Sequence, residues 1–226
     1  MIKLTPPKTE AELLSRCYPL CGITFSALAL RYHQTLPSSL TQAKGLIGQL
    51  LEVALGASAG NQPEPDFPNL GIELKTIPID AHGHPRETTY VCTAPINLKA
   101  EIESWENSRV RKKLARVLWV PVEADPEIPL PDRCIGNAQL WSPDHHTEAT
   151  LRQDWIELTH MLHLGQTDNL SAKIGTYLQI RPKAAHSRIL NPGINEHGEE
   201  ILINPKGFYL RTTLTQKILE YCYCRA

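Results

Sequence analysis

The stretch Asp66-Phe-Pro-Asn-Leu-Gly-Ile-Glu73-Leu-Lys75-Thr-Ile-Pro78 contains the pattern on which the interpretation of this chain depends. One carboxylate is followed, after six intervening residues, by a Glu-x-Lys with an apolar spacer. Successive side chains of a strand point to opposite faces, so Glu73 and Lys75 share the face that Leu74 avoids. Two residues of strand advance about 7 Å, which places the carboxylate and the ammonium side by side.

Asp66 arrives from a proline-rich turn at 63–66 and can fold back towards the face of Glu73 and Lys75. Two converging carboxylates bind a hard divalent cation such as Mg²⁺ through oxygen, and a nearby lysine can steady a phosphate or the attacking water. The pattern therefore predicts a metal-dependent phosphodiesterase. The alternative is an exposed Glu-x-Lys on an edge strand that is only a solvated surface, and these residues alone leave both interpretations open.

The composition indicates an ordinary globular protein. Of the 226 residues, 42% are apolar and 21% are charged, which is enough for one sizeable core or a core divided into two lobes. No segment approaches the ~18 apolar residues of a membrane span, and the first residues lack the apolar region of a secretory signal. The six cysteines are therefore expected to be reduced thiols, and the cytoplasm is the expected location.

Charge is distributed unevenly along the chain, although the net charge is only −1. Five of the eight residues from Arg109 to Arg116 are cationic, and no acid occurs between Asp168 and Glu196. Acids concentrate instead at 101–106 and 123–132. This distribution predicts one basic surface that could meet nucleic acid, with ordinary solvated faces as the alternative.

The pattern of apolar residues predicts a mixed α/β fold. Thr9 and Glu12 form a capping-box pattern that opens a first helix. Gly45 and Gly48 weaken the strongest helix, and close backbone approach to another element or a ligand is a plausible reason for them. The first two strands are expected to form a hairpin that bears the acidic face. Helices are predicted at about 9–16, 26–31, 41–55 and 148–163, and strands at about 71–79, 88–93, 117–122, 177–183 and 207–211.

Other polar residues are candidates for the same chemistry. Glu52, on the strongest helix, could be a third acid or a surface glutamate. Lys113 could clamp a phosphate or lie on an exposed basic helix. Arg181 and Lys183 flank a proline, which suggests a projecting loop, and arginine is the commonest reader of guanine edges. Tyr209 could donate a hydrogen bond or pack against a base, and ordinary polar strand ends are the alternative for all three of these last residues.

The sequence gives little support for a zinc site, an ATP-binding loop or a serine nucleophile. The pairs His160/His163, His82/His84 and Cys17/Cys21 lack a further ligand at zinc-site spacing. The sequence contains neither a Gly-x4-Gly-Lys-Ser/Thr phosphate loop nor a Gly-x-Ser-x-Gly elbow.

Seven segments in collinear order resemble the MutH family of DNA mismatch repair endonucleases. The similarity covers roughly residues 5–215. It implies a restriction-endonuclease-like α/β fold, a single domain over 1–226 with two lobes around a DNA cleft, and a catalytic lobe at about 20–125. The segments are 51–60, 66–78, 87–92, 117–123, 140–143, 177–184 and 207–210.

The resemblance also implies an activity. A family member nicks the unmethylated strand of a hemimethylated GATC site, 5′ to the G, with Mg²⁺, and leaves a 5′-phosphate and a 3′-hydroxyl. It works as a monomer in the bacterial cytoplasm and is activated by MutL, which MutS recruits at a mismatch. The implied catalytic set is Glu52, Asp66, Glu73 and Lys75, assisted by Lys113, with Asp66, Glu73 and Glu52 as the metal-binding carboxylates.

The implied DNA contacts are Lys44, Tyr90, Arg181, Lys183 and Tyr209. Arg181 and Tyr209 fall where the family senses the sequence and its adenine methylation. Residue 90 is tyrosine here, whereas the family pattern predicts a phenylalanine that wedges between bases.

Two other functions are alternatives to a mismatch repair endonuclease. A GATC-specific type II restriction endonuclease would cut both strands, which normally needs two active sites, and one motif in 226 residues favours nicking instead. A non-catalytic DNA-binding module of the same fold is the second alternative. The presence of all four of Glu52, Asp66, Glu73 and Lys75 argues against that module.

Overall fold

The computed structural model describes residues 4–37, 45–60, 62–94, 103–166, 170, 173–183, 190–195, 197 and 199–223. The chain divides into two compact units, each built from separated segments. Unit 1 comprises Met1–Glu87, Ala115–Ser142 and Gln216–Ala226, and unit 2 comprises Thr88–Leu114 and Pro143–Thr215.

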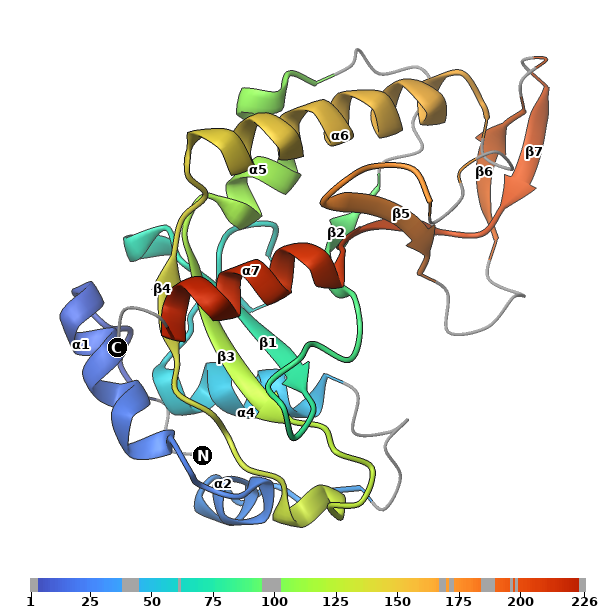
Figure 1. Cartoon of the computed structure of the whole chain (residues 1–226). Coiled ribbons are helices and arrows are strands. Elements are labelled where there is room, and N and C mark those ends of the chain that lie inside the picture. The colour runs from blue at the N-terminus through green and yellow to red at the C-terminus, as the bar shows by residue number, and fades with distance from the viewer. Residues whose placement is uncertain are drawn as a thin grey trace. The chain divides into compact units, whose positions relative to one another are not determined.

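Unit 1 is built on a three-stranded sheet with the order β1-β3-β4 (Figure 1). β1 (Glu73–Ile79) pairs in parallel with β3 (Val117–Glu123), and β3 pairs antiparallel with β4 (Gln139–Trp141). Helix α4 packs against β1, and its buried leucines join those of the other helices and of β1 in one apolar core. The helices of this unit are α1 (Glu10–Cys17), α2 (Phe25–Arg31) and α4 (Leu46–Leu55).

The helix ends of unit 1 follow from their sequence. The Thr9 hydroxyl accepts a hydrogen bond from the Glu12 backbone N–H at 3.1 Å, so the predicted N-cap is confirmed. The Glu12 carboxylate accepts from the Lys8 N–H at 2.8 Å instead of the Thr9 N–H, so the capping box is not completed. Gly45 and Gly56 bound α4 in left-handed conformations that glycine adopts without strain. A Cβ added at Gly45 or at Gly48 would meet no atom within 4 Å among the described residues. No other described element therefore packs closely against the backbone at these two glycines.

Unit 2 is built on an antiparallel sheet with the order β2-β8-β5. The long helix α6 packs on β5 and carries buried Leu151, Trp155, Leu158 and Leu162 on one side. The elements of this unit are β2 (Thr89–Thr93), α5 (Arg109–Leu114), α6 (His145–His163), β5 (Leu178–Pro182), β6 (Asn191–Ile194), β7 (Glu200–Ile203) and β8 (Lys206–Leu210).

The structure contradicts one expectation from the sequence and contains elements that the sequence pattern did not predict. β1 and β2 do not form a hairpin: β1 pairs with β3 in unit 1, and β2 pairs with β8 in unit 2. The Pro/Gly/Asn-rich stretch after residue 190 contains the strand pair β6-β7. No element was predicted after residue 211, where the structure has a helix, α7 (Thr212–Tyr223), and the boundary between the two units falls within this helix.

The described cysteines form no disulfide, in agreement with the prediction of reduced thiols. Burial raises the pKa of the Cys17 thiol to about 12. None of the helices in the described part of the chain is long and apolar enough to cross a membrane.

Candidate functional site

The acidic motif forms a tight loop that brings Asp66 back onto β1. Phe67 and Ile72 exchange backbone hydrogen bonds of 2.9 and 3.3 Å across a single turn of 3-10 helix, Pro68–Leu70. Gly71 closes this turn with a φ of 66°, a value that favours glycine. The six residues between the two carboxylates therefore form a loop that returns Asp66 to β1, and its place on the face of Glu73 and Lys75 stays a prediction.

Asp66 is fixed to β1 by a hydrogen bond to a backbone N–H. This N–H is unused by the described sheet because β1 lies at its edge. The Glu73 N–H points towards β3 and donates to the Arg116 carbonyl, so the next N–H along, that of Leu74, points away from the sheet. Asp66 Oδ2 accepts from this Leu74 N–H at 2.8 Å. The Asp66 carbonyl accepts from Ser58 N–H at 3.0 Å, which ties the loop to the segment after α4.

Glu73 and Lys75 share one face of β1, as the alternation predicts, but they are not solvent-exposed. Lys75 Nζ lies 3.2 Å from Glu73 Oε1, and both side chains are more than nine-tenths buried. The alternative interpretation, a solvated Glu-x-Lys, is therefore wrong. Burying an ion pair costs desolvation energy, and apolar residues of similar size often stabilise a fold as well or better. Stability alone does not explain this pair.

Glu52 lies near the end of α4, partly buried, on a helix that packs against β1. Among the residues that the structure describes, no three His, Cys, Asp or Glu side chains are close enough together to hold a metal ion. Glu52 therefore does not form a ready three-carboxylate cluster with Asp66 and Glu73 in this structure, and its part in placing a metal ion or its water stays a prediction. The chemistry of Asp66 and Glu73, two carboxylates beside one ammonium, is the all-oxygen donor type that Mg²⁺ prefers.

The cationic segment 109–116 presents fewer charges than its sequence indicates. Arg111 Nε donates to Glu148 Oε1 at 2.7 Å, and this contact holds the pKa of Glu148 below its usual value. Arg116 pairs with Glu10 at 2.6 Å within unit 1. Lys113 is buried on α5 in unit 2, so the expectation of an exposed basic helix is wrong for this residue. Its assistance to residues of unit 1 stays a prediction.

Four predicted DNA-contacting residues gather on one face of the β2-β8-β5 sheet. We call the face that bears Tyr90, Tyr209, Arg181 and Lys183 the tyrosine face. The rings of Tyr90 and Tyr209, which are direct partners in the β2-β8 register, meet edge to face with centroids 5.3 Å apart. Arg181 lies with its guanidinium carbon 6.0 Å from the Tyr209 ring centroid, and Lys183 Nζ lies 4.4 Å from that of Tyr90.

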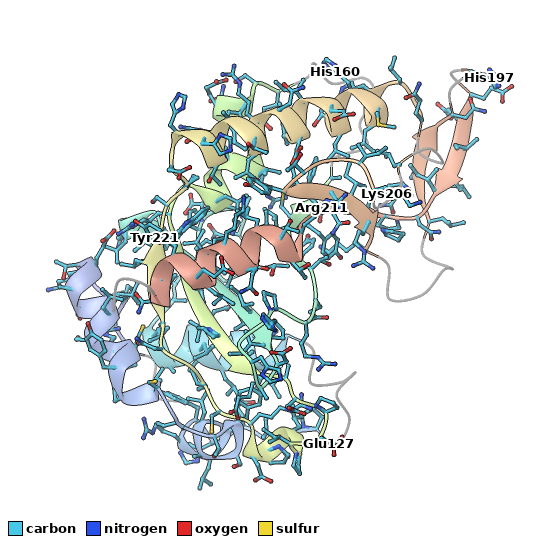
Figure 2. All side chains as sticks on the ribbon, in the orientation of Figure 1. Glu127, His160, His197, Lys206, Arg211 and Tyr221 are labelled. Carbon is cyan, nitrogen blue, oxygen red and sulfur yellow. The ribbon has the colours of Figure 1, made fainter. Side chains whose placement is uncertain are left out.

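Arg181 does not lie on a projecting loop but in β5, and Lys183 is the first residue after this strand. β5 continues through Pro182, and proline is tolerated there because β5 is an edge strand of the described sheet. Arg181 therefore extends from a strand that is paired with β8, and the Lys183 backbone N–H after it donates to the Pro205 carbonyl at 2.7 Å. β8 begins at Lys206 and ends just before Arg211, and both of these residues are labelled in Figure 2. Lys44, the remaining predicted DNA contact, lies outside the described residues.

Sequence reasoning missed three residues of this face. Thr88 accepts a hydrogen bond from Arg181 Nη1 at 2.8 Å, and Thr93 accepts one from Lys183 Nζ at 3.0 Å. Gly207 lies beneath the two rings, because a Cβ there would stand 2.9 Å from Tyr90 Cε2. A glycine in a strand is a signal for such a close approach, whereas the two threonines carried no recognisable signal.

Comparison with known proteins identifies the family. The family model described as DNA mismatch repair enzyme MutH matches residues 55–154. The DNA mismatch repair protein MutH of Yersinia pseudotuberculosis serotype IB (strain PB1/+) is 50% identical over 214 residues, which cover 95% of this chain and 93% of that protein. The chain belongs to the MutH family.

A second MutH relative gives the same result across almost the whole chain. The DNA mismatch repair protein MutH of Salmonella paratyphi C (strain RKS4594) is 51% identical over 216 residues, 96% of this chain and 93% of that protein. Membership confirms the predicted α/β fold of restriction-endonuclease-like type and assigns the chain to DNA mismatch repair. The matched range 55–154 includes the MutH acidic loop at Asp66 and β1, and the similarity to the relatives extends over the tyrosine face as well.

Proposed function

We propose that this chain is an endonuclease that nicks the unmethylated strand of hemimethylated GATC sites, 5′ to the G, during mismatch repair. The observation that carries the proposal is the acidic loop, in which Asp66 is fixed to β1 beside the buried Glu73–Lys75 pair. Membership in a family of DNA mismatch repair enzymes supports the substrate class.

The donor set fits Mg²⁺ by its chemistry, with Asp66 and Glu73 as the carboxylates that would hold the ion and Glu52 helping to place it or its water. Bound there, the ion would polarise the scissile phosphate and lower the pKa of a water. The hydrogen bond from the Leu74 N–H orients the Asp66 carboxylate. Lys75, held against Glu73, is placed to orient the attacking water or to stabilise charge that develops on the phosphate.

The tyrosine face is the proposed DNA-contacting surface. Two cations and two aromatic rings on one sheet face combine the groups that meet phosphates and bases. Arg181 and Tyr209 would read the GATC site and its methylation, whereas Lys183 would contact the backbone. Tyr90 keeps the ring that the family pattern predicts at this position and adds a hydroxyl. Lys44 and Lys113 would add phosphate contacts, and Lys113 would assist the catalytic residues.

The protein would act as a monomer in the bacterial cytoplasm, activated by MutL that MutS recruits to a mismatch. A GATC-specific type II restriction endonuclease would instead produce double-strand breaks. A non-catalytic module would bind DNA without hydrolysis, and the buried Glu73–Lys75 pair would then have no role in that function.

A nicking assay tests the proposal. Duplexes with one unmethylated, hemimethylated or fully methylated GATC site are incubated with the protein, with and without Mg²⁺ and MutL, and the strand that is cut is identified. Glu73→Gln and Lys75→Ala should each reduce nicking by at least about 10²-fold, the typical loss for a group that stabilises transition-state charge. Glu127→Gln is the matched control, since Glu127 is an exposed glutamate of unit 1 (Figure 2). Wild-type nicking by Glu73→Gln would reject the catalytic assignment.

A further inference from the structure

Lys183, on the tyrosine face, is held by hydrogen bonds to other side chains of the protein in the absence of DNA. Its Nζ donates to the Tyr90 hydroxyl at 2.5 Å and to Thr93 Oγ1 at 3.0 Å, and these two oxygens are themselves hydrogen-bonded at 3.0 Å. The ammonium also lies over the Tyr90 ring. Two side chains of β2 and the lysine that directly follows β5 thus form one closed network.

A β-bulge makes this network possible. Tyr90 and Thr93 are three residues apart, and in a regular strand they would point to opposite faces. The register of β2 against β8 shifts between Tyr90 and Cys92, so that Tyr90 faces Tyr209 while Thr93 faces Gly207. Because one residue is inserted, both hydroxyls reach the same side of the sheet as Lys183.

The partners of Lys183 leave its charge available. Both are neutral hydroxyls, and among the described residues no carboxylate lies within ion-pair distance of its ammonium. A lysine ammonium has three N–H donors, and the two hydroxyls take two of them. The third donor has no partner in the part of the chain that the structure describes. The side chain is exposed, so this donor and the full positive charge can meet an anion from solution.

We propose that Thr93 and the Tyr90 hydroxyl are positioning residues that hold Lys183 ready for a DNA phosphate, an inference that rests on the proposed DNA-contacting role of the tyrosine face. A free lysine side chain has a flexible four-carbon stem and loses much of its freedom when it binds. Holding it in advance moves that cost from binding to folding. The hydroxyls supply this order without neutralising the charge that the phosphate needs.

The test compares four substitutions for binding to a short duplex with one hemimethylated GATC site, in EDTA so that no cleavage occurs. Thr93→Val keeps the β-branched shape and removes the hydroxyl, and Tyr90→Phe keeps the ring and removes the hydroxyl. Each should weaken binding about threefold to tenfold, the range for one ordered side chain. Thr93→Ser retains the hydroxyl and should bind as the wild type does. Lys183→Ala should weaken binding further and reduce the slope of log K against log salt by about 1.

Two readouts separate positioning from a structural role. In the Lys183→Ala background, Thr93→Val should have no further effect, because its action passes through Lys183. Thr93→Val alone should leave the salt slope unchanged, because the phosphate contact still forms. Equal weakening in both backgrounds, or wild-type binding by Thr93→Val, would overturn the positioning proposal and leave the proposed function standing. Wild-type binding by Lys183→Ala would instead remove Lys183 from the proposed DNA-contacting surface, and the positioning proposal with it.

Discussion

Asp154 on α6 anchors the start of β5, and replacing it gives the sharpest stability prediction for unit 2. The side chain is only 4% exposed. Its Oδ1 accepts from the Thr176 N–H at 2.8 Å, and its Oδ2 accepts from the Tyr177 and Leu178 N–H groups at 2.6 and 2.8 Å. The chain reaches this carboxylate through Gly175, whose φ of 85° favours glycine.

The magnitude follows from which N–H groups lose a partner. Asp154→Ala leaves the buried Tyr177 and Leu178 N–H groups unpaired, at about 1–3 kcal/mol each, so the expected loss of stability is about 2–6 kcal/mol. Asp154→Asn can keep its oxygen at the Oδ2 position and pair both of them. Thr176 is exposed, so its N–H can turn to water, and the expected loss is about 1–2 kcal/mol.

Urea unfolding measures the free energy of unfolding of Asp154→Ala and Asp154→Asn, with Glu157→Ala as the control. Glu157 is an exposed carboxylate on the same helix, and its removal should change stability by less than about 0.5 kcal/mol. Hydrogen exchange supplies the local readout: the Tyr177 and Leu178 amides should lose protection in Asp154→Ala and largely keep it in Asp154→Asn. If Asp154→Ala were as stable as the control, or if Asp154→Asn were the more damaging change, the reasoning would be refuted.

Three further outcomes are expected. Because Arg111 holds the pKa of Glu148 below 4.5, this contact stabilises unit 2 above that pH, and the stability difference between wild type and Glu148→Gln should vanish as acid titration passes through the lowered pKa. With a pKa of about 12 and a buried side chain, Cys17 should resist iodoacetamide at neutral pH while exposed Cys21 reacts, as peptide mass spectrometry will show. Gly48→Ala should stabilise α4 by about 1 kcal/mol in thermal unfolding, and a simultaneous loss of DNA binding would indicate that a ligand approaches the backbone there.

Local features of the fold could be predicted from the sequence because neighbouring residues determine them. Thr9 and Glu12 lie at the spacing of a cap, and the turn ending at Gly71 returns Asp66 to β1. The shared face of Glu73 and Lys75 follows from strand alternation alone. Helix α7 was not predicted, although its buried Leu214, Ile218, Leu219 and Cys222 recur at helical spacing.

Strand pairing and burial could not be predicted in the same way. Two strands joined by a short turn favour a hairpin locally, yet β1 pairs with β3 and β2 pairs with β8, because burial of apolar faces across distant segments decides the partners. The bulge after Tyr90 leaves no mark in the alternation, so Thr93 was assigned to no site. The burial of Glu73 and Lys75 likewise depends on what covers β1, which the motif does not contain.

Charge counted along a sequence is a poor guide to the charge that a ligand meets. The net charge is −1, so long-range electrostatic attraction to a polyanion is weak, and the proposed DNA recognition would depend on a few placed cations. In the most basic segment, Arg111 and Arg116 are paired with glutamates of the same chain. Lys183, in a segment of lower charge density, is held by hydroxyls that leave its charge intact. Ordering a lysine in this way costs side-chain entropy in the fold, and the proposed contact with a DNA phosphate would use that order. The proposed DNA contact is therefore better placed on the tyrosine face than on the basic helix.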